Sequence, residues 1–195
     1  MLEHDVLVIG AGLAGMRAAI AARAEGASVA IISKVHPVRS HSNAAQGGIN
    51  AALTDRGDDW EDHAYDTVKG SDFLGDQDAI EVMCASAGQA LIDMEHFGVT
   101  FNRDDEGKLG TRAFGGQRRA RTFFVGDFTG QALLHVMFEQ LIKSGVRRYE
   151  EWFVTALIEE DGRVCGVTAL EIRTGQIYAI RAKTVIFCTG GLGRL

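Results

Sequence analysis

The sequence has 195 residues, of which 46% are hydrophobic, a length and composition that suit one domain with a sizeable core. Its net charge of −6 argues against a nucleic-acid partner, because such proteins need basic surface to neutralise phosphates. Three widely spaced cysteines and six histidines without ligand spacing predict a reducing compartment, no disulfide framework and no metal site.

The first predicted element is a buried strand over residues 5–9, followed by a glycine turn and a helix over residues 13–25. The glycines have the G-x-G-x-x-G spacing of a dinucleotide-binding turn, set between a strand and a helix. In such a turn the first glycine permits the tight bend, the second lets the backbone approach a pyrophosphate, and the third lets the helix lie close to the strand. A structural turn with incidental glycines is the alternative. The predicted cofactor contacts are Gly10, Ala11, Gly12, Leu13, Ala14 and Gly15.

A second buried strand is predicted over residues 28–33, parallel to the first because a helix connects them. NAD-binding units usually carry Asp or Glu near the end of this strand to hold the adenosine ribose. Here Ser33 and Lys34 occupy that place. A hydroxyl can still bond a ribose and a lysine can approach phosphate, so both are predicted contacts. The departure disfavours NAD and leaves NADP or FAD open.

Residues 34–49 form a predicted loop at the carboxyl ends of the strands, where ligands bind in open α/β sheets. The loop reads Arg39-Ser40-His41-Ser42 and then Ala44-Ala45-Gln46-Gly47-Gly48-Ile49. This order resembles the flavoprotein subunits of succinate dehydrogenases and fumarate reductases. In that family the histidine of the R-S-H-[ST] motif is joined to the 8α-methyl carbon of FAD, so the resemblance implies covalent FAD at His41. It also implies FAD contacts at Arg39, Ser40, Ser42, Ala45, Gln46, Gly47 and Gly48.

Two helices are predicted in the middle of the chain, over residues 58–70 and from a cap at Asp76 to about Phe97. Most charge of the first helix is expected to face water. In the second helix, Met83 and Met94 fall on the apolar spacing and are expected in the core. Residues 102–110 read as an exposed turn or hairpin tip.

The next motif, Thr111-Arg-Ala-Phe114-Gly-Gly, resembles the family's R-[PA]-F-G-G segment. The phenylalanine of that segment lines the dicarboxylate pocket, so the resemblance implies that Phe114 and Gln46 line a substrate pocket; ordinary packing is the alternative for Phe114. A further helix is predicted from about Thr129. Phe128 and Gln131 depart from the family's D-R-T-G-H and leave the subgroup open.

The last third of the chain predicts strands over residues 151–160, 163–173 and 176–181, which form a β-meander, and then a buried strand over residues 183–188. A meander between two parallel strands is characteristic of two-dinucleotide flavoproteins. The final T-G-G-x-G-R resembles the family's FAD-contacting turn. The resemblance therefore implies FAD contacts at Val154, Thr189, Gly190 and Gly191.

The predicted fold class is α/β: a Rossmann-like FAD-binding domain with a parallel sheet, helices and a β-meander crossover, incomplete at the C-terminus. Chains of this family are much longer, and their proton-shuttling arginine, substrate-binding residues and capping domain follow the T-G-G turn. We therefore expect residues 1–195 to be the N-terminal part of an FAD-binding domain, to contain no catalytic residue and to be inactive alone.

For the intact protein, the resemblance implies interconversion of succinate and fumarate by hydride transfer with FAD, and electron transfer to an iron–sulfur subunit and quinone. Membrane anchor subunits would hold it in the cytoplasm at the inner face of the membrane, without a span of its own. Three alternatives stay open: an L-aspartate oxidase-like FAD enzyme, a nicotinamide-dependent dehydrogenase, and a truncated, non-catalytic nucleotide-binding fragment.

Overall fold

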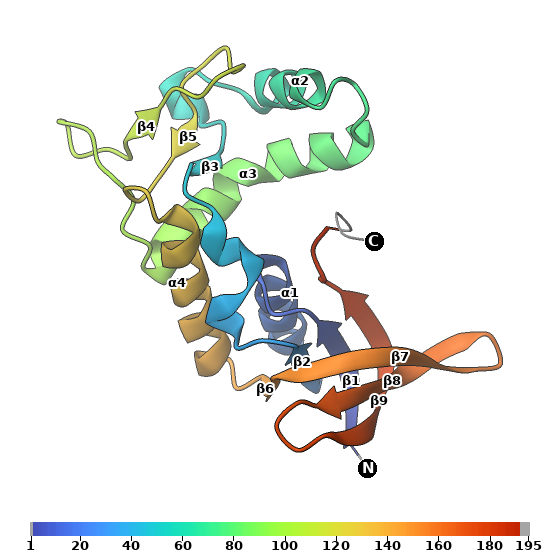
Figure 1. Ribbon diagram of the computed structural model, residues 1–195. Coiled ribbons are helices and arrows are strands. Elements are labelled where there is room, and N and C mark those ends of the chain that lie inside the picture. Colours follow the sequence, from blue (N-terminus) through green and yellow to red (C-terminus); the bar gives the residue numbers. More distant parts are fainter. Residues whose placement is uncertain (1, 192–195) are drawn as a thin grey trace. The chain divides into compact units, whose positions relative to one another are not determined.

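The computed structural model describes residues 2–191, which divide into two compact units (Figure 1). Residues 2–43 and 134–191 form the first unit, and residues 44–133 form the second unit. Within the described range, no helix is both long enough and apolar enough to cross a membrane.

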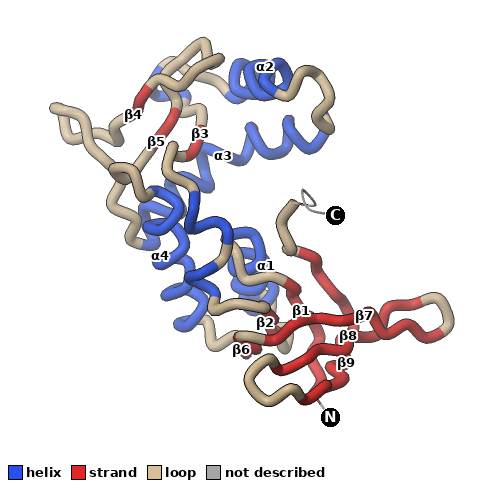
Figure 2. The backbone as a smooth tube through the Cα atoms, in the orientation of Figure 1, coloured by secondary structure: helices blue, strands red, loops and turns tan. Residues whose placement is uncertain are grey.

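The first unit is built on a six-stranded sheet with the order β6-β2-β1-β9-β8-β7 (Figure 2). The strands β6, β2, β1 and β9 are parallel to one another, whereas β7 and β8 form the antiparallel meander with β9. The predicted parallel pairing of the first two strands and the meander are thus confirmed. The strand bounds are β1 Leu2–Ile9, β2 Val29–Ser33, β6 Arg147–Glu150, β7 Trp152–Glu160, β8 Arg163–Glu171 and β9 Gln176–Phe187.

The strand β9 differs from the prediction, because it is one continuous strand where two were expected. Its first half pairs with β8 as far as Arg181, while residues from Ile180 to Phe187 pair in parallel with β1. No glycine, proline or other turn residue separates the two halves, so nothing ends the first one. The expected burial of the second half was wrong: Phe187 is 58% exposed, because β9 extends beyond the end of its pairing with β8.

Buried side chains cover both faces of the parallel strands, as is usual for parallel sheets. All five residues of β2 are buried. The helix α1 (Leu13–Ala24) contributes buried Met16 and Ala19. The core on the meander side consists of Leu7, Ile9, Ala30, Ile32, Tyr149, Val167, Ala169, Ile180 and Ala182.

The second unit contains the helices α2 (Trp60–Gly70) and α3 (Gln77–Phe97) and a small sheet. The sheet has the order β3 (Ile49–Asn50), β5 (Thr122–Phe123) and β4 (Thr111–Arg112). Asp76 caps α3 by accepting a hydrogen bond from the Ala79 amide at 3.2 Å, as predicted. The helix α4 (Thr129–Lys143) begins where expected.

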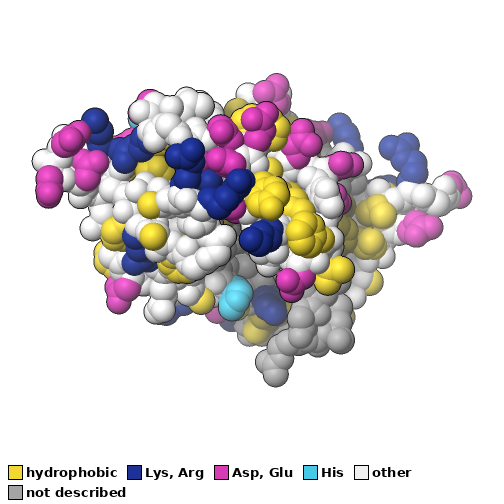
Figure 3. Space-filling view, turned by 90° about the horizontal axis from the view of Figure 1, so that it is seen from above, with side chains coloured by type: hydrophobic (Ala, Val, Ile, Leu, Met, Phe, Trp, Pro, Cys, Tyr) yellow, Lys and Arg dark blue, Asp and Glu magenta, His cyan; other side chains and the backbone are white. Residues whose placement is uncertain are grey.

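Burial in α2 and α3 was only partly predicted. Most charge of α2 was expected to face water, and Asp66 is an exception: it is buried because it is paired with arginines. Met83 was expected in the core but is 50% exposed. The buried residues of α3 are Cys84 and Leu91. Figure 3 shows acidic, basic and hydrophobic side chains intermingled over the face in view.

Candidate functional site

The glycine turn between β1 and α1 has the geometry that its spacing predicts. Gly10 has a φ of +103°, in the region that favours glycine, and a Cβ there would lie 2.2 Å from the Cys188 carbonyl oxygen. A Cβ on Gly15 would lie 1.8 Å from the Gly10 carbonyl oxygen. A side chain is therefore excluded at both positions. The tight turn at Gly10 and the close approach of α1 at Gly15 are confirmed.

The Arg39–Ser42 motif lies directly over the N-terminus of α1. A Cβ on Gly12, the N-cap residue, would lie 3.2 Å from Ser42 Oγ and 3.7 Å from Ser40 Oγ. The Leu13 amide donates to Ser42 Oγ at 3.4 Å. Two motifs predicted separately thus meet within the first unit, at a helix N-terminus whose N–H groups favour an anion.

Two buried polar atoms of the segment that follows β2 lack hydrogen-bond partners. Across residues 2–191, only Ser40 Oγ, Asn43 Oδ1 and His63 Nδ1 are buried side-chain atoms that lack a hydrogen-bond partner. An unsatisfied buried polar atom costs about 1–3 kcal/mol, so such atoms are rare in native structures unless a ligand satisfies them. Ser40 and Asn43 therefore fit a bound dinucleotide, as does the glycine turn, in which Gly10 and Gly15 have no room for a side chain. Sequence reasoning missed Asn43, which no motif marked.

The other predicted contacts of the first unit lie at or near the same strand ends. His41 is exposed at the start of a short 3-10 helix, His41–Ala44. Thr189 is the second residue after β9, and its amide nitrogen would lie 3.3 Å from a Cβ on Gly10. Gly190 and Gly191 come next in the chain, whereas residues 192–195, with the rest of the predicted T-G-G-x-G-R motif and the chain end, lie outside the described residues.

The remaining predicted contacts of this unit differ in exposure. Ser33 is buried at the end of β2 and Lys34 is exposed just after it, while Arg39 is exposed. Val154 lies in β7, where it packs against the meander-side core next to a register shift. Its side chain therefore has a packing role.

In the second unit, the segments that contain Gln46 and Phe114 are in contact. Arg112 donates a hydrogen bond to the Gln46 carbonyl oxygen at 3.0 Å and, through Nε, another to the Gly47 carbonyl oxygen at 3.0 Å. A Cβ on Gly47 would lie 3.0 Å from the tip of the Phe114 ring. Phe114 is 50% exposed, and Gly48 has a φ of +116° that favours glycine. Arg112 joins the two motifs, a role that sequence spacing could not reveal.

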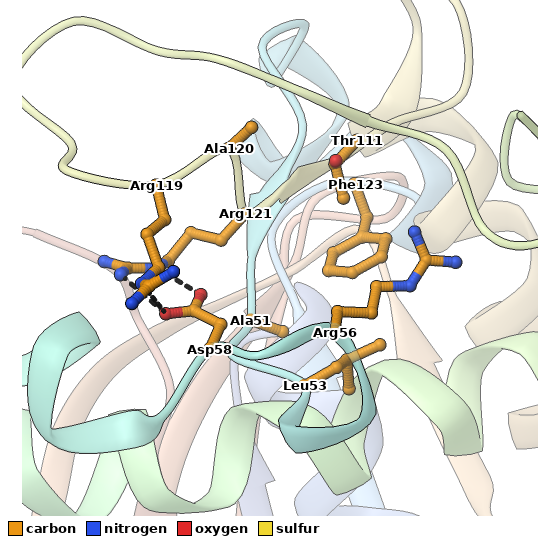
Figure 4. A pocket seen from close by; sticks show the side chains of 9 residues that line it. All are labelled: Ala51, Leu53, Arg56, Asp58, Thr111, Arg119, Ala120, Arg121 and Phe123. Carbon is orange, nitrogen blue, oxygen red and sulfur yellow. Dashed lines mark hydrogen bonds and ion pairs between the residues drawn. The ribbon is translucent and has the colours of Figure 1, made fainter.

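Neither Gln46 nor Phe114 lines the cavity of about 310 Å³ in this unit (Figure 4). Its polar wall is an ion-pair cluster around Arg121, which is 1% exposed. Arg121 Nε and Nη2 donate to the Asp58 carboxylate at 2.8 and 3.0 Å, and Nη1 donates to Asp66 at 2.7 Å. Although burial opposes ionisation of Asp66, hydrogen bonds from Arg118 and Arg121 lower the pKa of its carboxyl. Since Asp58 and Asp66 occupy the Arg121 donors, we assign the cluster a structural role. The cavity is lined by Ala51, Leu53, Arg56, Asp58, Thr111, Arg119, Ala120, Arg121 and Phe123.

Comparison with known proteins gives a consistent result. The family described as "FAD binding domain" matches residues 5–195. A fumarate reductase flavoprotein subunit of Mycobacterium tuberculosis is 48% identical over 99% of this chain and 33% of its own length. A succinate dehydrogenase flavoprotein subunit of Rickettsia bellii is 48% identical over 98% of this chain and 34% of its own length.

Solved structures agree. A variant of E. coli quinol fumarate reductase FrdA superimposes with a TM-score of 0.92 and 38% identity, over 100% of this chain and 34% of that chain. The Mycobacterium smegmatis Sdh1 complex in the apo form gives a TM-score of 0.93 and 33% identity, over 98% of this chain and 35% of that chain. The resemblance and the α/β fold class inferred from the sequence are confirmed. The chain spans about a third of the length of these relatives.

Proposed function

The chain belongs to the FAD-binding domain family, and from this premise we propose that it is the FAD-holding part of a flavoprotein that interconverts succinate and fumarate. The observation that carries the proposal is the arrangement at the N-terminus of α1. Gly10 and Gly15 leave no room for side chains there, and Ser40 and Ser42 lie against Gly12. The relatives named for fumarate reductase and succinate dehydrogenase support the substrate pair.

The chain's own residues hold and orient the cofactor. When bound, FAD supplies the acceptor or donor of a hydride, while the protein supplies position and electrostatics. The N–H groups in the first turn of α1 bind the pyrophosphate, since a helix N-terminus attracts anions. Ser40 and Asn43 acquire the hydrogen-bond partners that their buried atoms lack. His41, exposed beside them, would provide the ring nitrogen for a covalent bond to the 8α-methyl carbon of FAD; a methyl C–H and the imidazole N–H would be broken, and the flavin ring would take up the electron pair.

The second unit contributes to the substrate side. Gln46 and Phe114 contact the dicarboxylate, and Arg112 fixes the segment that carries Gln46 by binding two consecutive carbonyl oxygens. Fixing a loop in this way reduces the entropy that is lost when the substrate binds. Arg112 is therefore a positioning residue in this proposal.

The intact protein passes its electrons to an iron–sulfur subunit and then to quinone, and membrane anchor subunits hold it in the cytoplasm at the inner face of the membrane. Support comes from solved relatives, of which one is a quinol–fumarate reductase with menaquinol and another is Sdh1 with UQ1. As in the sequence prediction, the membrane association belongs to the partner subunits.

Two measurements test this function. Titration of FAD into the chain, followed by flavin fluorescence, is expected to show saturable binding. Denaturing gel electrophoresis of the intact flavoprotein is expected to show fluorescence that migrates with the polypeptide. His41→Ala removes this fluorescence but keeps reversible FAD binding, whereas His96→Ala, at an exposed histidine of α3, keeps both. Gel fluorescence in the His41→Ala protein would refute the covalent site, and a chain that binds no FAD would refute the function.

A further inference from the structure

An acidic residue on the neighbouring strand lies beside the position where the chain lacks the usual ribose-binding acid. The strands β2 and β6 pair in parallel, and their register sets Ser33 opposite Glu150. Each is the last residue of its strand, so both lie at the carboxyl edge of the sheet, where Gly10 also follows β1. Register partners on adjacent parallel strands lie about 4.8 Å apart and direct their side chains to the same face.

The Glu150 carboxylate faces the loop that follows β2. Its Oε2 lies 3.7 Å from His36 Nε2, and its Oε1 accepts a hydrogen bond from Arg148 Nε at 2.9 Å. The His36 ring packs edge-on against Phe138, with 5.1 Å between the ring centroids. The side chain of Glu150 is 31% exposed. An ionised carboxylate has about four acceptor sites, so these contacts leave acceptor capacity for hydroxyl donors.

The chemistry of this edge suits a ribose. Nucleotide-binding units of this type hold the ribose hydroxyls with a carboxylate at the end of the second strand, where this chain has Ser33. We infer that Glu150 provides this carboxylate from β6 and, together with Ser33, recognises the adenosine ribose of FAD. A ribose with a 2′-phosphate would bring negative charge against Glu150, so the site selects against NADP-like ligands. The inference rests on the proposed FAD binding and adds the residue that selects the ribose.

The test compares FAD with analogues whose adenosine ribose lacks the 2′- or the 3′-hydroxyl. All proteins carry His41→Ala, which keeps binding reversible, and dissociation constants come from quenching of flavin fluorescence. The parent is expected to bind FAD about tenfold more tightly than at least one analogue, as a hydrogen bond to a charged group predicts. Glu150→Gln has nearly the same shape without the charge and is expected to bind FAD about tenfold less tightly than the parent does. Its preference for FAD over the analogues is expected to fall to about twofold or less. Glu150→Ala is expected to behave in the same way and serves if the glutamine variant misfolds.

Glu151→Gln is the matched control, because Glu151 is the next residue, is exposed and lies in the turn after β6. It removes the same charge from the chain and is expected to keep both the affinity and the preference. A Glu150→Gln protein that still prefers FAD over the analogues would overturn the inference, as would a parent without any preference. If the parent binds no FAD, the proposed function fails and the inference fails with it. If the parent binds FAD and both analogues equally, only the inference about Glu150 fails.

Discussion

Arg112 Nε donates a hydrogen bond to the Gly47 carbonyl oxygen at 3.0 Å, although 65 positions separate the two residues. The guanidinium also lies over the Phe124 ring, 4.4 Å from its centroid. A planar fork and a cation–π contact together hold the Gln46–Gly47 segment in a way that a lysine cannot reproduce.

We therefore predict that Arg112→Ala in the intact flavoprotein lowers succinate turnover about tenfold or more, since misplacement of a positioning segment weakens the alignment of bound substrate. Arg112→Lys recovers only part of the loss. The flavin absorbance spectrum reports whether FAD stays bound in both variants. Unchanged kcat and KM in Arg112→Ala would contradict the assigned role.

Replacement of the third glycine should be far more damaging than replacement of an unconstrained one. Gly15→Ala places a Cβ 1.8 Å from a backbone oxygen, whereas Gly70, near the end of α2, has nothing within 4 Å of such an atom. We expect Gly15→Ala to lower the free energy of unfolding by about 2 kcal/mol or more, and Gly70→Ala to raise it by up to about 1 kcal/mol. Urea denaturation of both variants measures this. Equal midpoints would show that α1 can move away from β1 at little cost.

Ser40→Ala should separate ligand binding from stability. Ser40 Oγ is buried without a partner, so its removal relieves an unsatisfied group. We expect the free energy of unfolding without FAD to stay constant or to rise. The dissociation constant for FAD should increase by about two- to tenfold, the value of one neutral hydrogen bond. A destabilised apoprotein with unchanged FAD affinity would show that the hydroxyl has a structural partner instead.

The ion-pair cluster predicts acid sensitivity. Hydrogen bonds from Arg118 and Arg121 lower the folded-state pKa of Asp66 below its usual value of 3.8. The unfolded state therefore binds more protons, so this stabilisation is fully present above about pH 4 to 5 and is lost as the pH falls through the folded-state pKa. Asp66→Asn should flatten the decline of the unfolding free energy below pH 5, and the exposed Asp105→Asn should leave the slope unchanged. A slope in Asp66→Asn equal to that of the wild type would exclude Asp66 as the sensitive group.

The 195-residue chain is expected to bind FAD without oxidising succinate. In the family that the chain resembles, the proton-transferring arginine follows the T-G-G turn, so no base within residues 1–195 is assigned to the reaction. An assay with an artificial electron acceptor, with FAD-saturated chain, should give no turnover above that of free FAD. Turnover that depends on the protein would place a base within these residues.

The sequence revealed features that depend on short stretches of chain. The glycine turn, β2 and the caps of α3 follow from local pattern, because glycine conformation, apolar runs and capping carboxylates act over a few residues. The strand β6 escaped prediction because Arg147–Glu150 is charged and contains only one buried residue, Tyr149. Its parallel pairing with β2 makes it a strand, and no local pattern contains this information.

The parts of the candidate site that were missed are non-local in the same sense. Arg112 was visible only as a basic residue beside a phenylalanine, and its acceptors lie in another segment. The burial of Asp66 likewise depends on arginines about 50 positions away in the sequence. The hydrophobic spacing of α3 predicted that Met83 lies in the core, and this prediction failed for a similar reason. Periodicity indicates which side of a helix is apolar but not whether another element covers that side.

The double pairing of β9 also has a consequence for the growing chain. β1 lies between β2, made about 20 residues later, and β9, whose pairing residues extend to Phe187. One hydrogen-bonding edge of β1 therefore stays open on the ribosome until nearly all of these 195 residues have emerged. An apolar strand edge exposed for that long can pair with other chains, and local β-hairpins do not protect it. Synthesis speed and chaperone protection of the Val6–Ile9 edge should thus limit the yield of folded protein.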